Sequence, residues 1–113
     1  ALNNYSYFLS LQGSNLEKAE QMSRKTIDIE PTNPTYLDTY AWILYKMNRS
    51  NEALFIIERA IDNGGDGVEI FEHYADILLS VGNIDKALQY WSKALEIAPD
   101  NVSIKEKIDK YKK

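Results

Sequence analysis

The stretch that decides the fold is residues 68–101, VEIFEHYADILLSVGNIDKALQYWSKALEIAPDN. Its apolar residues recur at the three- and four-residue spacing of a helix, on both sides of a break at Gly82 and Asn83. A second break follows at Pro99, where a helix cannot continue. This spacing predicts two helices, over residues 68–80 and 84–97, joined by a tight turn.

The same pattern recurs with a period of 34 residues. Ala87 has counterparts at Ala53 and Ala19. Two further sets keep the interval: Thr26, Ala60 and Ala94, then Pro31, Gly65 and Pro99. Tyr40, Ala41 and Leu44 recur as Tyr74, Ala75 and Leu78, and the earlier copy, Tyr5, Ser6 and Leu9, is displaced by one residue. A fixed period of this length indicates a repeat protein.

The period predicts an all-α chain made of helical hairpins. The predicted helices are residues 2–12, 16–29, 34–47, 51–62, 68–80, 84–97 and 102–112. We expect a single domain over residues 1–113, with repeats at about 1–33, 34–67 and 68–101 and a terminal helix at 102–113. Small residues are needed where paired helices approach closely, so Ala41 is expected to face Ala53, and Ala75 to face Ala87.

The third repeat resembles the tetratricopeptide repeat (TPR), a 34-residue helix-turn-helix unit. The matching residues are Phe71, Tyr74, Ala75, Leu78, Gly82, Ala87, Trp91, Ala94 and Pro99. The second repeat departs at Ile57 and Gly65, and the first at Ser23 and Thr26. The resemblance implies a right-handed α-α superhelix of three hairpins closed by a capping helix.

A narrower resemblance concerns the source of the chain. Residues 1–7 and 36–45 are similar to the C-terminal repeats of large Gram-negative bacterial TPR proteins, many of them envelope-associated. This implies a periplasmic or outer-membrane-associated protein, with a cytoplasmic one as the alternative. Ala1 falls where a helix is already expected, so we expect these residues to be part of a longer chain.

The terminal helix carries Ile104, Ile108 and Tyr111 on one stripe, with lysines elsewhere among Glu106 and Asp109. Repeat stacks need such a helix to cover the last hairpin. A solvated cap is therefore expected here, in preference to a basic ligand site. Trp91 falls on a packing position and is expected in the core.

In TPR proteins the first helix of each hairpin lines a concave face, and the resemblance implies a partner-binding surface there. The residues expected to form it are Asn3, Tyr7, Ser10, Thr35, Asp38, Trp42, Tyr45, Lys46, Glu69, Glu72, Asp76 and Leu79. Trp42 has two interpretations, a contact for the partner or a filler between hairpins.

Some family members bind a carboxylate terminus with Lys, Arg and Asn on this face. The corresponding places here are Asn3, Asp38, Glu72, Tyr7, Trp42 and Asp76. Because a carboxylate would meet like charge, the expected partner is a protein or peptide that is apolar with some basic residues. The alternative is a structural or self-association module without a foreign ligand, of which a homodimer is one form.

Other functions find little support in the sequence. The net charge of -4 and pI near 5.0 disfavour nucleic acid, and no apolar run is long enough to enter a membrane. Without cysteine, and with His73 as the single histidine, neither a metal site nor a catalytic residue is expected. His73 is expected at the surface or at the edge of the groove. We therefore expect a scaffold with no enzymatic activity and no cofactor.

Overall fold

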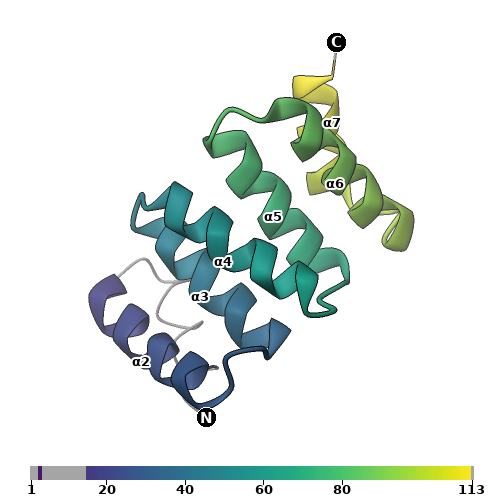
Figure 1. Cartoon of the computed structure of the whole chain (residues 1–113). Coiled ribbons are helices and arrows are strands. Elements are labelled where there is room, and N and C mark those ends of the chain that lie inside the picture. Colours follow the sequence, from purple (N-terminus) through teal and green to yellow (C-terminus); the bar gives the residue numbers. More distant parts are fainter. Residues whose placement is uncertain (1–2, 4–14, 113) are drawn as a thin grey trace. The chain divides into compact units, whose positions relative to one another are not determined.

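The computed structural model describes residue 3 and residues 15–112. These residues form helices and no strand. The helices are α2 (Leu16–Ile29), α3 (Pro34–Lys46), α4 (Ser50–Asp62), α5 (Val68–Ser80), α6 (Ile84–Ile97) and α7 (Val102–Tyr111) (Figure 1). Each begins and ends within one residue of its predicted bounds. The helix predicted over residues 2–12 falls, apart from Asn3, outside the described residues.

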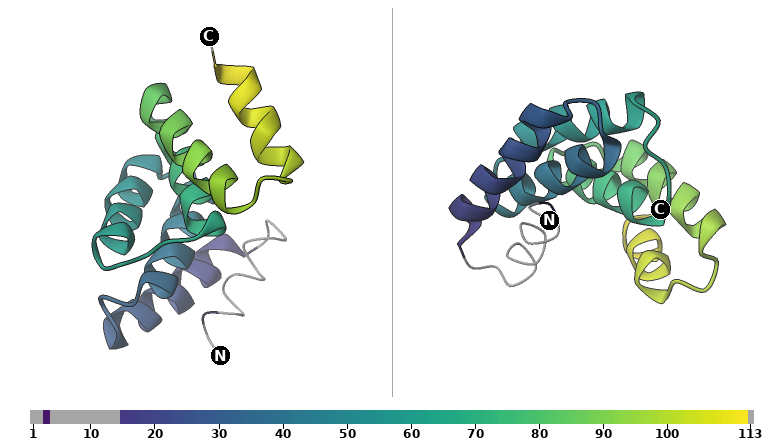
Figure 2. Two further views of the ribbon diagram at one scale, coloured as in Figure 1. Left: turned by 90° about the vertical axis from the view of Figure 1, so that its right-hand side faces the viewer. Right: turned by 90° about the horizontal axis from the view of Figure 1, so that it is seen from below.

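The chain divides into two compact units, residues 1–65 and 66–113. In the N-terminal unit, α3 and α4 form a helical hairpin and α2 packs against α3. In the C-terminal unit, α5 and α6 form the second hairpin and α7 packs against α6 (Figures 1 and 2). The boundary between the units falls two residues from the predicted boundary between the second and third repeats.

Small residues fill the close approaches inside each hairpin, as the sequence predicts. Ala41 and Ala53 are fully buried in the N-terminal unit, and Ala75 and Ala87 are fully buried in the C-terminal unit. An alanine lets two helix backbones come near each other without leaving a cavity. The alanines therefore recur every 34 residues because the same close contact between paired helices recurs in each hairpin.

The turns inside the hairpins follow from Asn48 and Gly82, which are 34 residues apart and both have a positive φ, 62° and 90°. In each turn, the backbone N–H of the next residue donates to a carbonyl in the last turn of the preceding helix. Arg49 donates to Leu44 and Asn83 donates to Leu78, both at 2.9 Å. These bonds close the helix ends as in a Schellman motif.

Asparagine also starts several helices. The side chains of Asn33, Asn83 and Asn101 accept hydrogen bonds from the backbone N–H groups of Tyr36, Lys86 and Ile104. Such N-caps satisfy one of the donors that a helix leaves unpaired at its first turn. Pro34 occupies the first turn of α3, where its missing N–H costs nothing.

Helix α7 closes the C-terminal unit. Ile104 and Trp91 are fully buried, and the ring of Tyr111 stacks on that of Trp91 with 5.7 Å between centroids. The predictions of a capping helix and of a core position for Trp91 are confirmed. Within the part of the chain that the structure describes, no helix has the length and apolar character needed to cross a membrane.

Candidate partner-binding surfaces on α3 and α5

The predicted residues of α3 form an aromatic surface on the N-terminal unit. The half-buried rings of Trp42 and Tyr45 lie 4.9 Å apart between centroids. The ammonium group of the exposed Lys46 lies 5.3 Å from the centroid of the Trp42 ring, which is a cation-π distance. Thr35 is exposed and lies about two turns before Trp42 on the same helix. We call Thr35, Trp42, Tyr45 and Lys46 the α3 surface.

Not every predicted residue is accessible. Asp38 and Asn3 are buried, with 8% and 9% of their surfaces exposed. Trp42 is half-buried, so its exposure is compatible both with a contact for a partner and with a filler between hairpins. Tyr7 and Ser10 fall outside the described residues. Among the described residues of the N-terminal unit, the accessible part of the prediction is therefore the α3 surface.

The predicted residues of α5 are joined to the capping helix. Lys107 of α7 donates to Glu72 Oε2 at 2.7 Å and to both carboxylate oxygens of Asp76 at 3.0 Å. Asp76 also accepts a hydrogen bond of 3.1 Å from the indole N–H of the buried Trp91. Glu69 is exposed and Leu79 is half-buried. Lys107 thus forms ion pairs with two of the three acidic residues of α5 that were predicted to bind a partner.

The environment of Lys107 favours its charged form. Burial acts to lower its pKa, but the hydrogen bonds to Glu72 and Asp76 and the charges of these carboxylates outweigh burial, so the pKa is raised above its ordinary value. The charge of Lys107 therefore persists at neutral pH and offsets part of the acidic character expected of α5.

The sequence prediction missed this role of Lys107 and misplaced His73. The expectation that His73 lies at the surface is wrong, because only 7% of it is exposed. The 34-residue period contains a signal for both, since Thr39, His73 and Lys107 occupy equivalent positions and Thr39 is also buried. This position points inward in both hairpins, which spacing around a single helix does not reveal.

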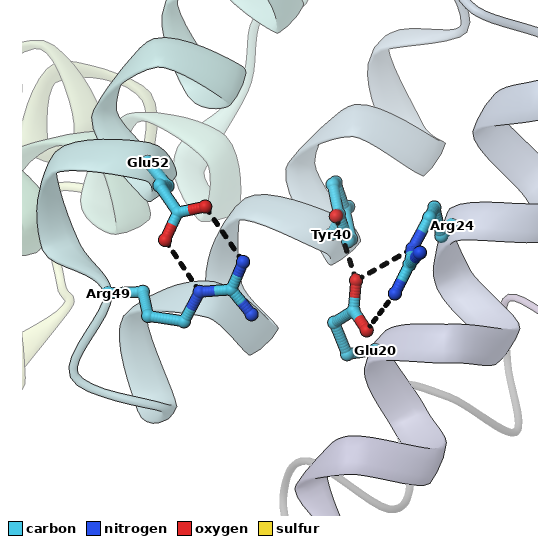
Figure 3. A network of polar contacts seen from close by, with 5 residues as sticks. All are labelled: Glu20, Arg24, Tyr40, Arg49 and Glu52. Carbon is cyan, nitrogen blue, oxygen red and sulfur yellow. Dashed lines mark hydrogen bonds and ion pairs between the residues drawn. The ribbon is translucent and has the colours of Figure 1, made fainter.

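A polar network, also not anticipated, joins α2 to α3 (Figure 3). Glu20 accepts two hydrogen bonds from the guanidinium group of Arg24, at 2.9 and 2.6 Å, and a third of 2.9 Å from the hydroxyl of Tyr40. Arg49 and Glu52 form a second bidentate pair at the start of α4, at 2.6 and 2.7 Å. Both pairs hold their charges in fixed geometry.

Titration of the first network reflects these bonds. Burial acts to raise the pKa of Glu20, yet its bonds from Arg24 and Tyr40 and the positive charge of Arg24 lower that pKa overall. Burial, and then the bond to Glu20, raise the pKa of Tyr40. Glu20 is therefore ionised at neutral pH although its side chain is only 7% exposed.

Comparison with known proteins agrees with this architecture. The model of the tetratricopeptide repeat family matches residues 68–101. Among solved structures, the first TPR domain of human RPAP3 is 16% identical, with a TM-score of 0.86 over 97% of this chain and 86% of that one. The second TPR domain of human RPAP3, in complex with the HSP70 peptide SGPTIEEVD, is 19% identical, with a TM-score of 0.84 over 100% of this chain and 93% of that one.

A bacterial structure is similar as well. The C-terminal part of a TPR repeat-containing protein from Cytophaga hutchinsonii is 20% identical, with a TM-score of 0.82 over 96% of this chain and 43% of that one. At these identities the likeness establishes the fold. The chain therefore has the all-α fold of the tetratricopeptide repeat proteins, and residues 68–101 match the tetratricopeptide repeat itself.

Proposed function

We propose that the chain is a scaffold, without enzymatic activity, that binds a partner polypeptide through the first helices of its hairpins, on the face that stacked repeats of this family make concave. The observation that carries the proposal is the α3 surface, where Trp42, Tyr45 and Lys46 combine an accessible aromatic pair with a cation. Aromatic side chains of this kind are the usual anchors of polypeptide partners.

The partner we propose is mainly apolar and carries some basic residues. Trp42 and Tyr45 offer apolar area, and Glu69 on α5 offers an exposed carboxylate. Because Lys107 already lies on Glu72 and Asp76, electrostatic attraction should contribute less than the number of acidic residues on α5 suggests. Salt should therefore weaken binding only modestly.

The acidic HSP70 peptide in the RPAP3 complex serves as a negative test. The places that correspond to a carboxylate clamp carry Asp38, Glu72 and Asp76 where such a clamp has Lys, Arg or Asn, so these residues offer the peptide's carboxylates no positive charge. We expect no binding of SGPTIEEVD to this chain. Saturable binding of that peptide would contradict the proposed charge preference.

A selection from a displayed peptide library tests the proposal without a known partner. We expect enriched peptides with aromatic or branched apolar residues and at least one Lys or Arg. The dissociation constant of the best synthetic peptide, measured by fluorescence anisotropy, should rise about tenfold or more in Trp42→Ala. Trp42→Phe should restore part of the affinity, and thermal melts should verify that both variants fold.

Two outcomes would refute the proposal. One is a selected peptide that binds wild type and Trp42→Ala equally. The other is a concentration-dependent dimer, seen by light scattering, in which Trp42 becomes inaccessible to a fluorescence quencher. The second outcome would favour the alternative, a structural or self-association module of a larger repeat protein. A bacterial envelope location, with the cytoplasm as the alternative, is part of the same proposal.

A further inference from the structure

The N-terminal hairpin contains a pocket of about 340 Å³ on another side of α3. It is lined by Tyr40, Leu44, Asn51, Glu52, Phe55 and Ile56. Side chains two residues apart on a helix point in directions roughly 160° apart, so Tyr40 faces away from Trp42. The pocket is therefore separate from the α3 surface.

Phe55 is an exposed aromatic residue at a position that packing does not require to be apolar. About 66% of its surface is exposed. The residues 34 positions before and after it are Gln21 and Gln89, both exposed. Exposure of a large apolar side chain to water is unfavourable. The aromatic ring at this position is therefore specific to the second repeat.

The C-terminal hairpin shows what fills the equivalent place. Tyr74 and Tyr90 are the counterparts of Tyr40 and Ile56 in the 34-residue period. The ring of Tyr90 lies edge-on to that of Tyr74, with 4.5 Å between centroids and 60° between planes, and 5.6 Å from Phe71. The N-terminal hairpin has the shorter Ile56 at this position, and the pocket lies beside it.

The charges around the pocket are balanced. Glu52 is paired with Arg49, and the hydroxyl of Tyr40 is bonded to Glu20, which is paired with Arg24 (Figure 3). Neither sign of charge is left in excess, so the surroundings suit an uncharged group. The volume is at the lower end for ligand sites, and six lining residues are too few for a stable dimer interface, which needs roughly 800 Å² per partner.

We propose that this pocket binds an uncharged aromatic side chain of a partner polypeptide, with the ring lying against Tyr40 as Tyr90 lies against Tyr74. Phe55 forms the exposed wall of the pocket and covers the incoming ring. This site is independent of the α3 surface. A partner can therefore use it whether or not the proposed concave face binds a polypeptide.

The test titrates the full chain with the neutral probe N-acetyl-phenylalanine amide and follows side-chain and amide resonances by NMR. A single side chain should bind weakly, with a dissociation constant on the order of 1 mM. We expect shifts centred on Leu44, Phe55 and Ile56, saturation that is unchanged by salt, and no shifts with N-acetyl-alanine amide.

Three variants make the test specific. Phe55→Gln introduces the residue of the other repeats and should weaken probe binding at least about tenfold. Ile56→Tyr should weaken it equally, because the new ring fills the pocket as Tyr90 does in the other hairpin. Ile97→Gln removes an apolar side chain of α6 that is 54% exposed, and it should leave binding unchanged.

Two results would overturn this proposal. One is probe binding that persists at wild-type strength in both Phe55→Gln and Ile56→Tyr. The other is a shift of the pocket resonances with protein concentration alone, abolished by Phe55→Gln, which would assign the pocket to a second copy of the chain. Neither result bears on the α3 surface, whose test uses Trp42→Ala.

Discussion

At the scale of the residue, the hairpin turns depend on one left-handed position. Gly82 has a φ of 90°, and a Cβ added there would meet no atom within 4 Å. Gly82→Ala should therefore lower the free energy of unfolding by about 1 kcal/mol through backbone strain alone. Gly82→Asn should lose less, because Asn48 adopts this conformation in the other hairpin. Urea denaturation of both variants measures the difference, and equal losses would contradict a backbone origin.

Ala87 illustrates the cost of bulk where two helices meet. It is fully buried between α5 and α6, so Ala87→Leu should lower the free energy of unfolding by about 1 to 3 kcal/mol. Gln89→Leu adds similar bulk at an exposed position of α6 and serves as the control. A thermal midpoint of Ala87→Leu that equals that of wild type would contradict the packing described here.

At the scale of the element, Glu20 joins α2 to α3 and makes the joint sensitive to acid. Its pKa is lower in the folded chain than its ordinary value of 4.5. The stabilisation is therefore complete above pH 4.5 and is lost as the pH falls through the folded pKa. In Glu20→Gln, the free energy of unfolding should fall less steeply below pH 4.5 than in wild type. Parallel pH profiles of the two chains, measured by urea denaturation, would exclude this role.

Lys107 is the corresponding polar joint between α7 and α5. Lys107→Met should lower the free energy of unfolding by about 1 to 3 kcal/mol, because it leaves Glu72 and Asp76 without their shared cation. The indole N–H resonance of Trp91 should also shift, since that group donates to Asp76. Lys105→Met, at an exposed position of α7, is the control and should change neither quantity.

The pH dependence of this joint has the opposite sign. The pKa of Lys107 is raised in the folded chain, so its contribution is complete below the ordinary value of 10.5 and is lost as the pH rises through the folded pKa. Alkaline conditions should therefore destabilise α7 in wild type and much less in Lys107→Met. Amide and indole N–H protons exchange rapidly with water in this pH range, so the carbon-bound ring protons of Trp91 are the readout.

The helices could be predicted closely, whereas the contacts between them could not. The bounds of α2, α5 and α6 follow from apolar spacing and from turn residues such as Gly82 and Pro99, which are local properties of the sequence. The link between Lys107 and Glu72 spans 35 residues, and the bond between Tyr40 and Glu20 spans 20. Such links depend on how the helices pack, which local spacing does not specify.

At the scale of the whole molecule, the chain forms two units. Each contains a helical hairpin of the same arrangement, but the side chains packed within the two hairpins differ. The 34-residue period predicted that design, and the comparison of Tyr90 with Ile56 became informative only when ring contacts were known. Of the residues predicted for a partner-binding surface, Trp42 and Tyr45 are half-buried and Lys46 is exposed, while their role in binding stays a prediction. The burial of Asp38 and the ion pairs of Lys107 with Glu72 and Asp76 could not be predicted from the sequence.

The central claim is that a polypeptide binds at the α3 surface. The most direct test is a map of amide chemical-shift changes when a library-selected peptide is added to the isotope-labelled chain. We predict that the largest changes cluster at Thr35, Trp42, Tyr45 and Lys46, and that they vanish in Trp42→Ala. Changes confined to α4 and α6, with α3 residues unaffected, would contradict the claim.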